Sequence, residues 1–262
     1  MDIVVVGYRS EAFLPRLFDD LEGMSVLPHQ VHYWDNIGNP KSLSVAWNDL
    51  SSQGRAPYLC ILNPDVALSP RWDERLIRAL DNPEIGTAHA ECAGRSVDGP
   101  IPSRATMEAL GARACGHGRV ETWDVLQCGI DALRFFCVMT RRADWERLHG
   151  VDERMRFWRQ DSDYHWRMRT RLGKFAAFVI GCPVWHHTGA STHAAIDRGE
   201  IDFAFECRLS DHLWDDVRSE HRKDWDFLTP GERAAVRRNP LFQRITPKNQ
   251  IVRHIVKHGV RS

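Results

Sequence analysis

Three apolar segments near the start of the chain end in polar residues, and a helical pattern follows each one. The apolar segments are 2–8 (DIVVVGY), 30–36 (QVHYWDN) and 58–62 (YLCIL). The segments that follow are 12–21, 42–50 and 72–80, and they show helical spacing or residues that favour a helix start. Strand and helix alternate three times, which is typical of an α/β domain. We therefore predict a doubly wound, mostly parallel sheet flanked by helices.

The third apolar segment stops abruptly at Asn63-Pro64-Asp65. Leu59–Leu62 is apolar on both faces, as in the buried centre of a parallel sheet. Pro64 has no N–H to donate to a neighbouring strand, so it ends the strand. Asp65 then lies just beyond the carboxyl end, the edge at which open α/β sheets bind ligands. An ordinary turn accounts for the same residues, because Asn, Pro and Asp all favour turns.

The rest of the chain is less regular. Residues 82–120 are rich in Gly, Ala and Pro and are expected to form loops and an irregular crossover. Four later elements are expected: a strand within 132–140, helices at 142–148 and 162–172, and a strand within 174–187. The last seventy or so residues are expected to be mainly helical.

Composition limits the class of protein. A chain of 262 residues, 43% hydrophobic and 27% charged, suits an ordinary globular protein with one large domain, with or without an appendage. It has no apolar run of about 20 residues, the length needed to span a bilayer, and no secretory signal follows Met1. The seven cysteines are scattered and never spaced as Cys-x-x-Cys, which favours reduced thiols over disulfides or a zinc cluster. We therefore expect a cytoplasmic protein.

The formal net charge is zero, but the charges are unevenly placed. From residue 233 to the C-terminus there is no acidic residue, and the eight basic ones are Arg233, Arg237, Arg238, Arg244, Lys248, Arg253, Lys257 and Arg261. A basic end on an acidic body favours an anionic partner. A solvated C-terminal helix is the simpler alternative.

Polar residues cluster where the predicted strands end. The clusters are Tyr8-Arg9-Ser10, Asp35-Asn36, Asn63-Pro64-Asp65 and His186-His187. Asp161 and Asp163 open a predicted helix, where negative charge is favourable. Together these residues predict a crevice lined by Asp35, Asp65, Asp161, Asp163 and a histidine. Oxygen ligands with one imidazole suit Mg²⁺ or Mn²⁺ better than a structural zinc.

The order and spacing of these motifs resemble the family-2 glycosyltransferases, which have the GT-A fold, and especially their rhamnosyltransferase-like branch. The likeness is carried by IVVVGYRS (3–10), WDNIGN (34–39), LNPDV (62–66), LHGVDERMRFWRQDSDYHWRMR (148–169) and VWHHTGAS (184–191). It implies a Rossmann-like GT-A domain over 1–192, with a nucleotide-binding half at 1–80 and an acceptor or catalytic half at 120–192. Residues 193–262 would form a helical, basic extension.

The resemblance also implies an activity and a set of site residues. The enzyme would be of the hexosyltransferase type, inverting and dependent on Mn²⁺ or Mg²⁺, and would move a sugar from a nucleotide-sugar to a hydroxyl acceptor. The implied donor-binding residues are Tyr8, Arg9, Ser10, Asp35, Asn36, Asn63, Asp65 and Trp158. Asp65 and His186 would hold the metal, with His187 as the fallback for His186. A strand-end pair bonded to the backbone is the plainer alternative for the two histidines.

Asp161 matches the family's general base, and Asp163 is a second catalytic candidate or a helix cap. The chain departs from the family pattern at Asn63, which replaces an Asp, at Gln160, which replaces a Glu, and at Gly7, which replaces Pro or Thr. Nothing recognisable covers the residues after 192.

Three functions stay open. The first is this glycosyltransferase, with a glycan or protein acceptor. The second is a phage-type enzyme that glycosylates hydroxymethylated DNA bases, which the basic C-terminal residues favour and which requires the base to be flipped out. The third is an inactive nucleotide-binding relative, which Asn63 and Gln160 permit.

Overall fold

The computed structural model describes residues 1–37, 41–95, 100–114, 119–125, 134–187 and 195–221. Within them lies one eight-stranded sheet, with the order β2-β1-β3-β7-β5-β8-β4 and β6 paired to β8. The strands are β1 (Asp2–Gly7), β2 (Gln30–Asp35), β3 (Tyr58–Leu62), β4 (Val66–Ala67), β5 (Ile85–Arg95), β6 (Arg119–Trp123), β7 (Cys137–Arg141) and β8 (Phe175–His186).

The sheet is mixed, and most of its strands point the same way. β1 is parallel to both β2 and β3, and β5 is parallel to β8. β7 runs antiparallel between β3 and β5, while β4 and β6 run antiparallel to β8. The prediction of a mostly parallel α/β sheet flanked by helices is confirmed.

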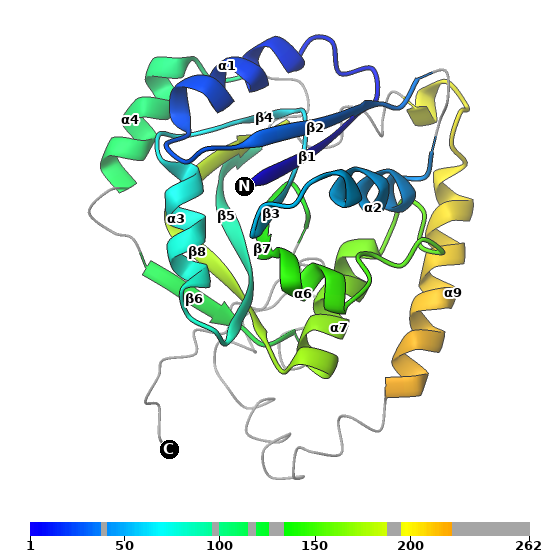
Figure 1. Ribbon diagram of the computed structural model, residues 1–262. Helices are drawn as coiled ribbons and strands as arrows, with labels where there is room; N and C mark the ends of the chain where they lie inside the picture. The colour runs from blue at the N-terminus through cyan, green and yellow to red at the C-terminus, as the bar shows by residue number, and fades with distance from the viewer. Residues whose placement is uncertain (38–40, 96–99, 115–118, 126–133, 188–194, 222–262) are drawn as a thin grey trace, which may run out of the picture.

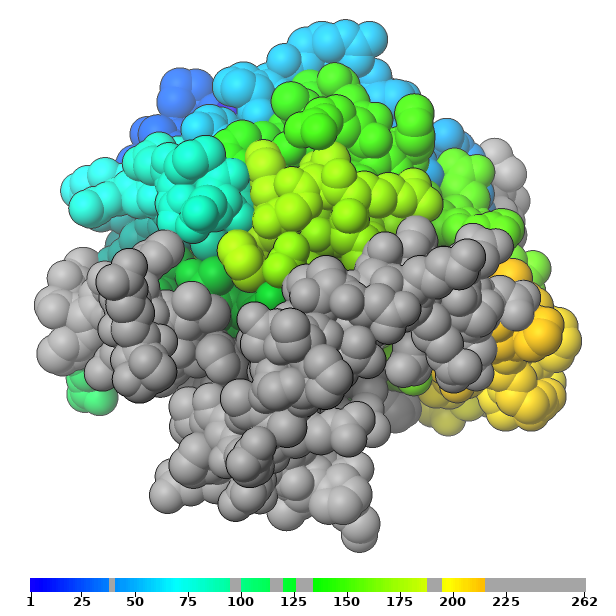
Figure 2. Space-filling model, turned by 90° about the horizontal axis from the view of Figure 1, so that it is seen from below, coloured from blue at the N-terminus to red at the C-terminus, as the bar shows by residue number. Residues whose placement is uncertain are grey.

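Helices cover both faces of this sheet (Figure 1). One face carries α1 (Leu14–Met24), α3 (Trp72–Leu80) and α4 (Arg104–Ala114); the other carries α2 (Leu43–Gln53), α6 (Arg142–Arg147) and α7 (Gln160–Leu172). α9 (Phe203–His221) packs on α7 and stands at the edge of the molecule (Figure 2). Among the helices of the described residues, none combines the length and the apolar content that crossing a bilayer needs.

The apolar pattern of the early strands explains this two-sided cover. In β1, Ile3 and Val5 join the core beneath α1 and α3, whereas Val4 joins the core beneath α2 and α6. In β3, Leu62 and Leu59 divide in the same way, because successive side chains of a strand point to opposite faces. Burying each such side chain stabilises the fold by roughly 1.5–3 kcal/mol.

The prediction of loops over residues 82–120 was wrong. That region holds the long strand β5, the helix α4 and the start of β6. The sequence of β5 shows no clear hydrophobic pattern because its buried residues are small, such as Ala88 and Ala90. α7 approaches β5 closely at Gly86, where a Cβ would lie 2.3 Å from the sulfur of Met168.

A buried ion network holds the edge where β1 and β2 begin. The carboxylate of Asp2 accepts hydrogen bonds from Arg142 (2.6 Å) and the Ala56 N–H (2.8 Å), and it lies 3.0 Å from His32 Nε2. Burial alone would raise the pKa of Asp2, but these three partners outweigh it and hold the pKa below its ordinary value. This network ties the first strand to β2 and α6, far from the carboxyl ends of the strands.

Candidate active site

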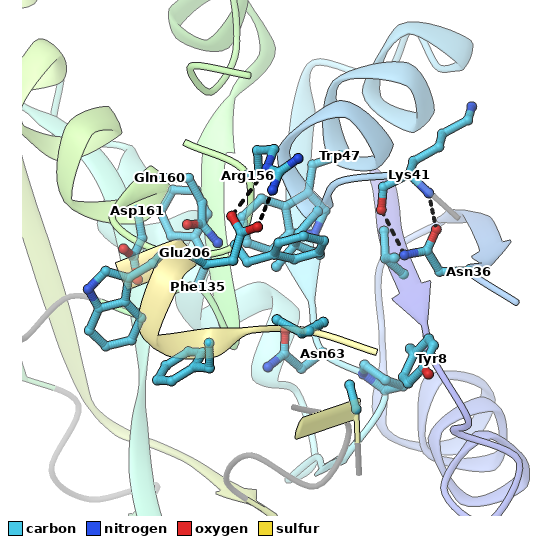
Figure 3. A pocket seen from close by; sticks show the side chains of 18 of the residues that line it. Tyr8, Asn36, Lys41, Trp47, Asn63, Phe135, Arg156, Gln160, Asp161 and Glu206 are labelled. Atoms are coloured by element: carbon cyan, nitrogen blue, oxygen red, sulfur yellow. Dashed lines mark hydrogen bonds and ion pairs between the residues drawn. The ribbon is translucent and has the colours of Figure 1, made fainter. Parts of the chain in front are cut away.

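A cleft of about 810 Å³ opens at the carboxyl ends of β1 and β3. Further walls come from residues 156–161, at the start of α7, and from residues 195–206. Figure 3 shows Tyr8, Asn63 and Asp161 around one cavity. The predicted site residues that line it are Tyr8, Arg9, Asn36, Asn63, Asp65, Trp158, Asp161 and His186. Four others do not line it: Ser10, Asp35, Asp163 and His187.

Asn63, Asp65 and His186 meet at the end of β3. The Asn63 N–H bonds to the Phe136 carbonyl, and β4 then begins at once and pairs with β8 through Val66 and His186. His186 Nε2 lies 3.3 Å from Asp65 Oδ1 and 3.2 Å from Asn63 Nδ2. The Phe136 ring stacks on the His186 ring, with centroids 5.0 Å apart. Packing therefore holds the three polar side chains together.

This trio fits a hard divalent cation. Asp65 Oδ1 is buried and makes no hydrogen bond within the described residues, and it faces a histidine nitrogen. Rotating the Asn63 carboxamide would bring its oxygen to the same side as these two atoms. The described residues hold no group of three or more His, Cys, Asp or Glu side chains placed to bind a metal. An ion here would complete its coordination with oxygen atoms of a bound ligand and with water, as Mg²⁺ commonly does.

Asp161 enters the cleft from the first turn of α7. Arg159, just before the helix, has a left-handed backbone with φ of 69°. The Ser162 N–H donates to Asp161 Oδ1 (2.8 Å). Burial raises the pKa of Asp161, against the lowering effect of that bond and of the Arg134 and Arg159 charges. A carboxyl group with a raised pKa accepts a proton more readily near neutral pH.

Asp163 does not reach the cleft. It is 1% exposed, and Arg167 Nε donates to its Oδ2 at 2.7 Å. The same guanidinium donates to the carbonyls of Leu148 and Gly150. Through Arg167, Asp163 ties α7 to the loop after α6, so the structure gives it a buried ion pair where the sequence suggested a base or a cap.

Tyr8-Arg9-Ser10 forms a tight turn after β1. Ser10 Oγ accepts from the Tyr8 N–H (3.0 Å) and lies 3.2 Å from the Tyr8 carbonyl oxygen, to which it donates. Arg9 has a φ of 49°, in the left-handed region. Ser10 is buried within this turn, so it shapes the cleft without lining it. The Arg9 guanidinium pairs with Glu200 at 2.9 Å.

The side chain of Asn36 is held by hydrogen bonds to Trp34 and Lys41. Its Oδ1 accepts from the Lys41 N–H (2.7 Å) and from Trp34 Nε1 (3.1 Å), and its Nδ2 donates to the Lys41 carbonyl (2.9 Å) (Figure 3). Asp35 is exposed and accepts from the Ile37 N–H at 3.3 Å. Asn36 therefore shapes this end of the cleft, and Lys41, which the sequence did not single out, lines it.

His187 contacts Asp65 through its backbone. Its N–H donates to the Asp65 carbonyl (2.8 Å), and its ring packs against Phe13. Gly189 and Ser191 of the predicted His-x-x-Gly-x-Ser segment lie outside the described residues, as does the basic stretch 233–262.

Several cleft residues were missed because no motif marks them. They include Trp47, Phe135, Glu200, Phe203 and Glu206. Trp158, which was predicted, meets Phe203 edge-on with ring centroids 5.7 Å apart. Residues 195–206 lie beyond the predicted end of the GT-A domain, yet they form part of the cleft.

No family model matches the chain, and no curated protein sequence matches it. Solved structures of S. aureus TarS do match, at 10–11% sequence identity. A structure of TarS 1–349 in complex with UDP has a TM-score of 0.50, over 95% of this chain and 76% of that one. A second structure of TarS 1–349 (87% and 74%) and one of TarS (79% and 41%) each have a TM-score of 0.49.

The chain therefore has the mixed α/β architecture of the GT-A glycosyltransferases. At 11% identity the likeness concerns the fold alone. It does not extend to the rhamnosyltransferase-like branch, which stays a prediction.

Proposed function

We propose that this protein is a glycosyltransferase that takes its sugar from a nucleotide-sugar donor. One observation carries the proposal: a single cleft at the carboxyl ends of β1 and β3 holds both the Asn63–Asp65–His186 trio and Asp161. The GT-A fold supports it, and the TarS structure with this fold is a complex with UDP, the diphosphate that a UDP-sugar releases.

Asp161 is the proposed general base. It would take the proton from the acceptor hydroxyl as that oxygen attacks the anomeric carbon from the face opposite the diphosphate. Such a reaction inverts the anomeric centre. A base of this kind typically contributes about 10²–10⁴-fold to the rate. The pKa of Asp161, which burial raises, suits this role.

Asp65 and His186, with the amide oxygen of Asn63, are the proposed ligands of Mn²⁺ or Mg²⁺. When bound, the ion supplies Lewis-acid stabilisation to the diphosphate as negative charge develops on it. The chain's own contribution is to hold the three side chains in place, through the Phe136–His186 stack and the β4–β8 pairing.

The two remaining walls have distinct proposed roles. Tyr8 and Lys41 lie at the end of the cleft beside Asn36, where the nucleoside would lie. Trp158 and Phe203 present apolar surface near Asp161, as a wall for a sugar ring.

Calorimetry with UDP, GDP, CDP and dTDP, each with Mn²⁺, tests donor binding. We expect one of them to bind, and we expect Asp65→Ala to weaken that binding. Glu74→Gln, which removes an exposed ion pair on α3, is the matched control and should bind like the wild type. Failure of all four nucleotides to bind would refute the proposal. Turnover of the matching nucleotide-sugar separates an enzyme from an inactive nucleotide-binding relative.

A DNA acceptor is the alternative, and it rests on the basic residues 233–262 in the sequence. Filter binding can decide between a DNA acceptor and a glycan or protein acceptor. It would be measured at two salt concentrations, on the full chain and on a chain truncated after residue 232. Each lost phosphate contact should reduce the slope of log affinity against log salt by about 0.9. Tight, tail-dependent binding to modified DNA would favour DNA; weak, tail-independent binding leaves a glycan or protein acceptor.

A further inference from the structure

The acidic and basic residues that line the cleft come from different parts of the chain. Its basic lining residues are Arg9, Lys41, Arg134, Arg156 and Arg159. Its acidic lining residues are Asp65, Asp161, Glu200, Asp202 and Glu206. Three of the five acids thus come from residues 195–206. Lys41 pairs with Asp49, outside the lining, at 2.6 Å. Without residues 195–206 the four arginines would therefore face two acids, an excess of two positive charges that favours an anion.

The acidic residues that follow β8 form ion pairs with arginines of the cleft. Residues 195–211, which we call the acidic strap, make three ion pairs with arginines of the cleft: Arg9–Glu200, Arg156–Glu206 and Arg159–Asp211. Arg156 approaches Glu206 through both Nε, which lies 3.2 Å from Oε2, and Nη2. Figure 3 shows this pair within the cavity. The Glu206 carboxylate therefore occupies the Nε and Nη2 donors of the Arg156 guanidinium.

The ion pairs of the acidic strap differ in how far solvent reaches them. The arginine side chains of these pairs are 21–46% exposed. Glu200 and Asp211 are 35% and 49% exposed, so solvent screens their pairs and each contributes little, whereas the Glu206 side chain is 7% exposed. Near the cleft, the Phe203 ring of the strap meets the Trp158 ring, and Phe205 is 46% exposed. A ligand with a higher negative charge can displace carboxylates held in this way.

We propose that Arg156, together with Arg9 and Arg159, binds the diphosphate of the donor, and that the strap carboxylates occupy these arginines until the donor arrives. This rests on the proposed function, because it takes the ligand to be a nucleoside diphosphate. Guanidinium groups pair with phosphate as they do with carboxylate, through two parallel N–H bonds. The diphosphate carries more charge than Glu206, so the exchange favours the ligand.

Calorimetry without added metal is the first test, with UDP and inorganic pyrophosphate as probes. Glu206→Gln removes the competing charge and should tighten binding of both probes by up to about fivefold, the scale of one ion pair that is open to solvent on its arginine side. Arg156→Gln should weaken both by about tenfold, as expected for a lost charge-assisted pair. Glu74→Gln, whose ion pair lies on α3, is the control and should change neither.

Hydrogen exchange of the α9 amides is the second test, and it needs no activity. Adding UDP to the wild type should increase exchange over residues 203–211, and Glu206→Gln should increase it without ligand. Decreased exchange on adding UDP would overturn the proposal, because the strap would then close over the donor. An unchanged affinity in Glu206→Gln would overturn it as well, even should Arg156→Gln fail to fold. Wild-type protein that binds no nucleoside diphosphate, even with Mn²⁺, would instead refute the proposed function.

Discussion

Replacing Asp163 by Asn should destabilise the fold, whereas the same change at Asp161 should stop the chemistry and spare the fold. Asp163 is 1% exposed, and its carboxylate is the counter-charge of the buried Arg167 guanidinium. Asn keeps the shape and can still accept one hydrogen bond, but it leaves a buried cation uncompensated. Breaking a buried pair in this way costs about 3–5 kcal/mol, and the retained bond favours the lower end.

That cost sets the size of the expected thermal shift. In a domain of this size each kcal/mol moves the Tm by about 2–4 °C, so Asp163→Asn should lower it by roughly 6–12 °C. Asp161 faces the cleft, and Asn at this position can still accept from the Ser162 N–H. Asp161→Asn should therefore change stability by no more than about 0.5 kcal/mol. Its turnover should fall by at least ~100-fold with little change in donor affinity, because a base acts in the transition state.

Thermal unfolding, UDP calorimetry and steady-state turnover on both variants test this pair of predictions. The wild type and Glu74→Gln are the references. An Asp163→Asn protein that melts like the wild type but loses turnover would move the base to Asp163. An Asp161→Asn protein that turns over normally would remove Asp161 from the mechanism.

Asp161, Asp65 and Asp2 each give a further prediction. The kcat/KM of the wild type should fall as pH falls through the pKa of Asp161, at a pH above that of an ordinary aspartate, because burial raises this pKa; a pH–rate profile measures it. Asp65→Ala should abolish Mn²⁺-dependent turnover and leave the Tm nearly unchanged, because Asp65 Oδ1 has no hydrogen bond within the described residues; full activity with Mn²⁺ would contradict this. Asp2→Ala should reduce the free energy of unfolding by about 3–5 kcal/mol in urea at neutral pH, because it leaves Arg142 buried without its carboxylate. The pKa of Asp2 is lower in the folded state than in the unfolded state. Asp2 therefore stabilises the wild type at pH values above its unfolded-state pKa, and this stabilisation should be lost as pH falls through its folded-state pKa. An Asp2→Ala variant as stable as the wild type at neutral pH would contradict this.

The first half of the sheet could be predicted because its signal is local. β1 and β3 are apolar on both faces, and the residues that follow them stop the strand at once. Strand direction has no such signal. The residues of β7 read as an ordinary strand, yet β7 runs antiparallel between β3 and β5. β5 was missed because close packing against α7 selects small residues such as Gly86.

The far wall of the cleft could not be predicted, because it depends on contacts between distant residues. Arg9 and Glu200 are 191 positions apart, and Arg156 and Glu206 are 50 apart. Each residue alone reads as a solvated charge. Only the fold shows that the acidic strap meets the arginines of the cleft.

The choice between Asp161 and Asp163, in contrast, could have been narrowed from the sequence. Two positions along a helix turn the side chain by about 200°, so the two carboxylates must point to nearly opposite sides of α7. Arg167 follows Asp163 by four residues, at the spacing that favours an ion pair along a helix. Asp161 has no basic residue at that spacing, because His165 occupies the position and its Nδ1 lies 2.7 Å from the Asp161 carbonyl oxygen. Asp161, the carboxylate without an ion-pair partner along the helix, is the one that lines the cleft.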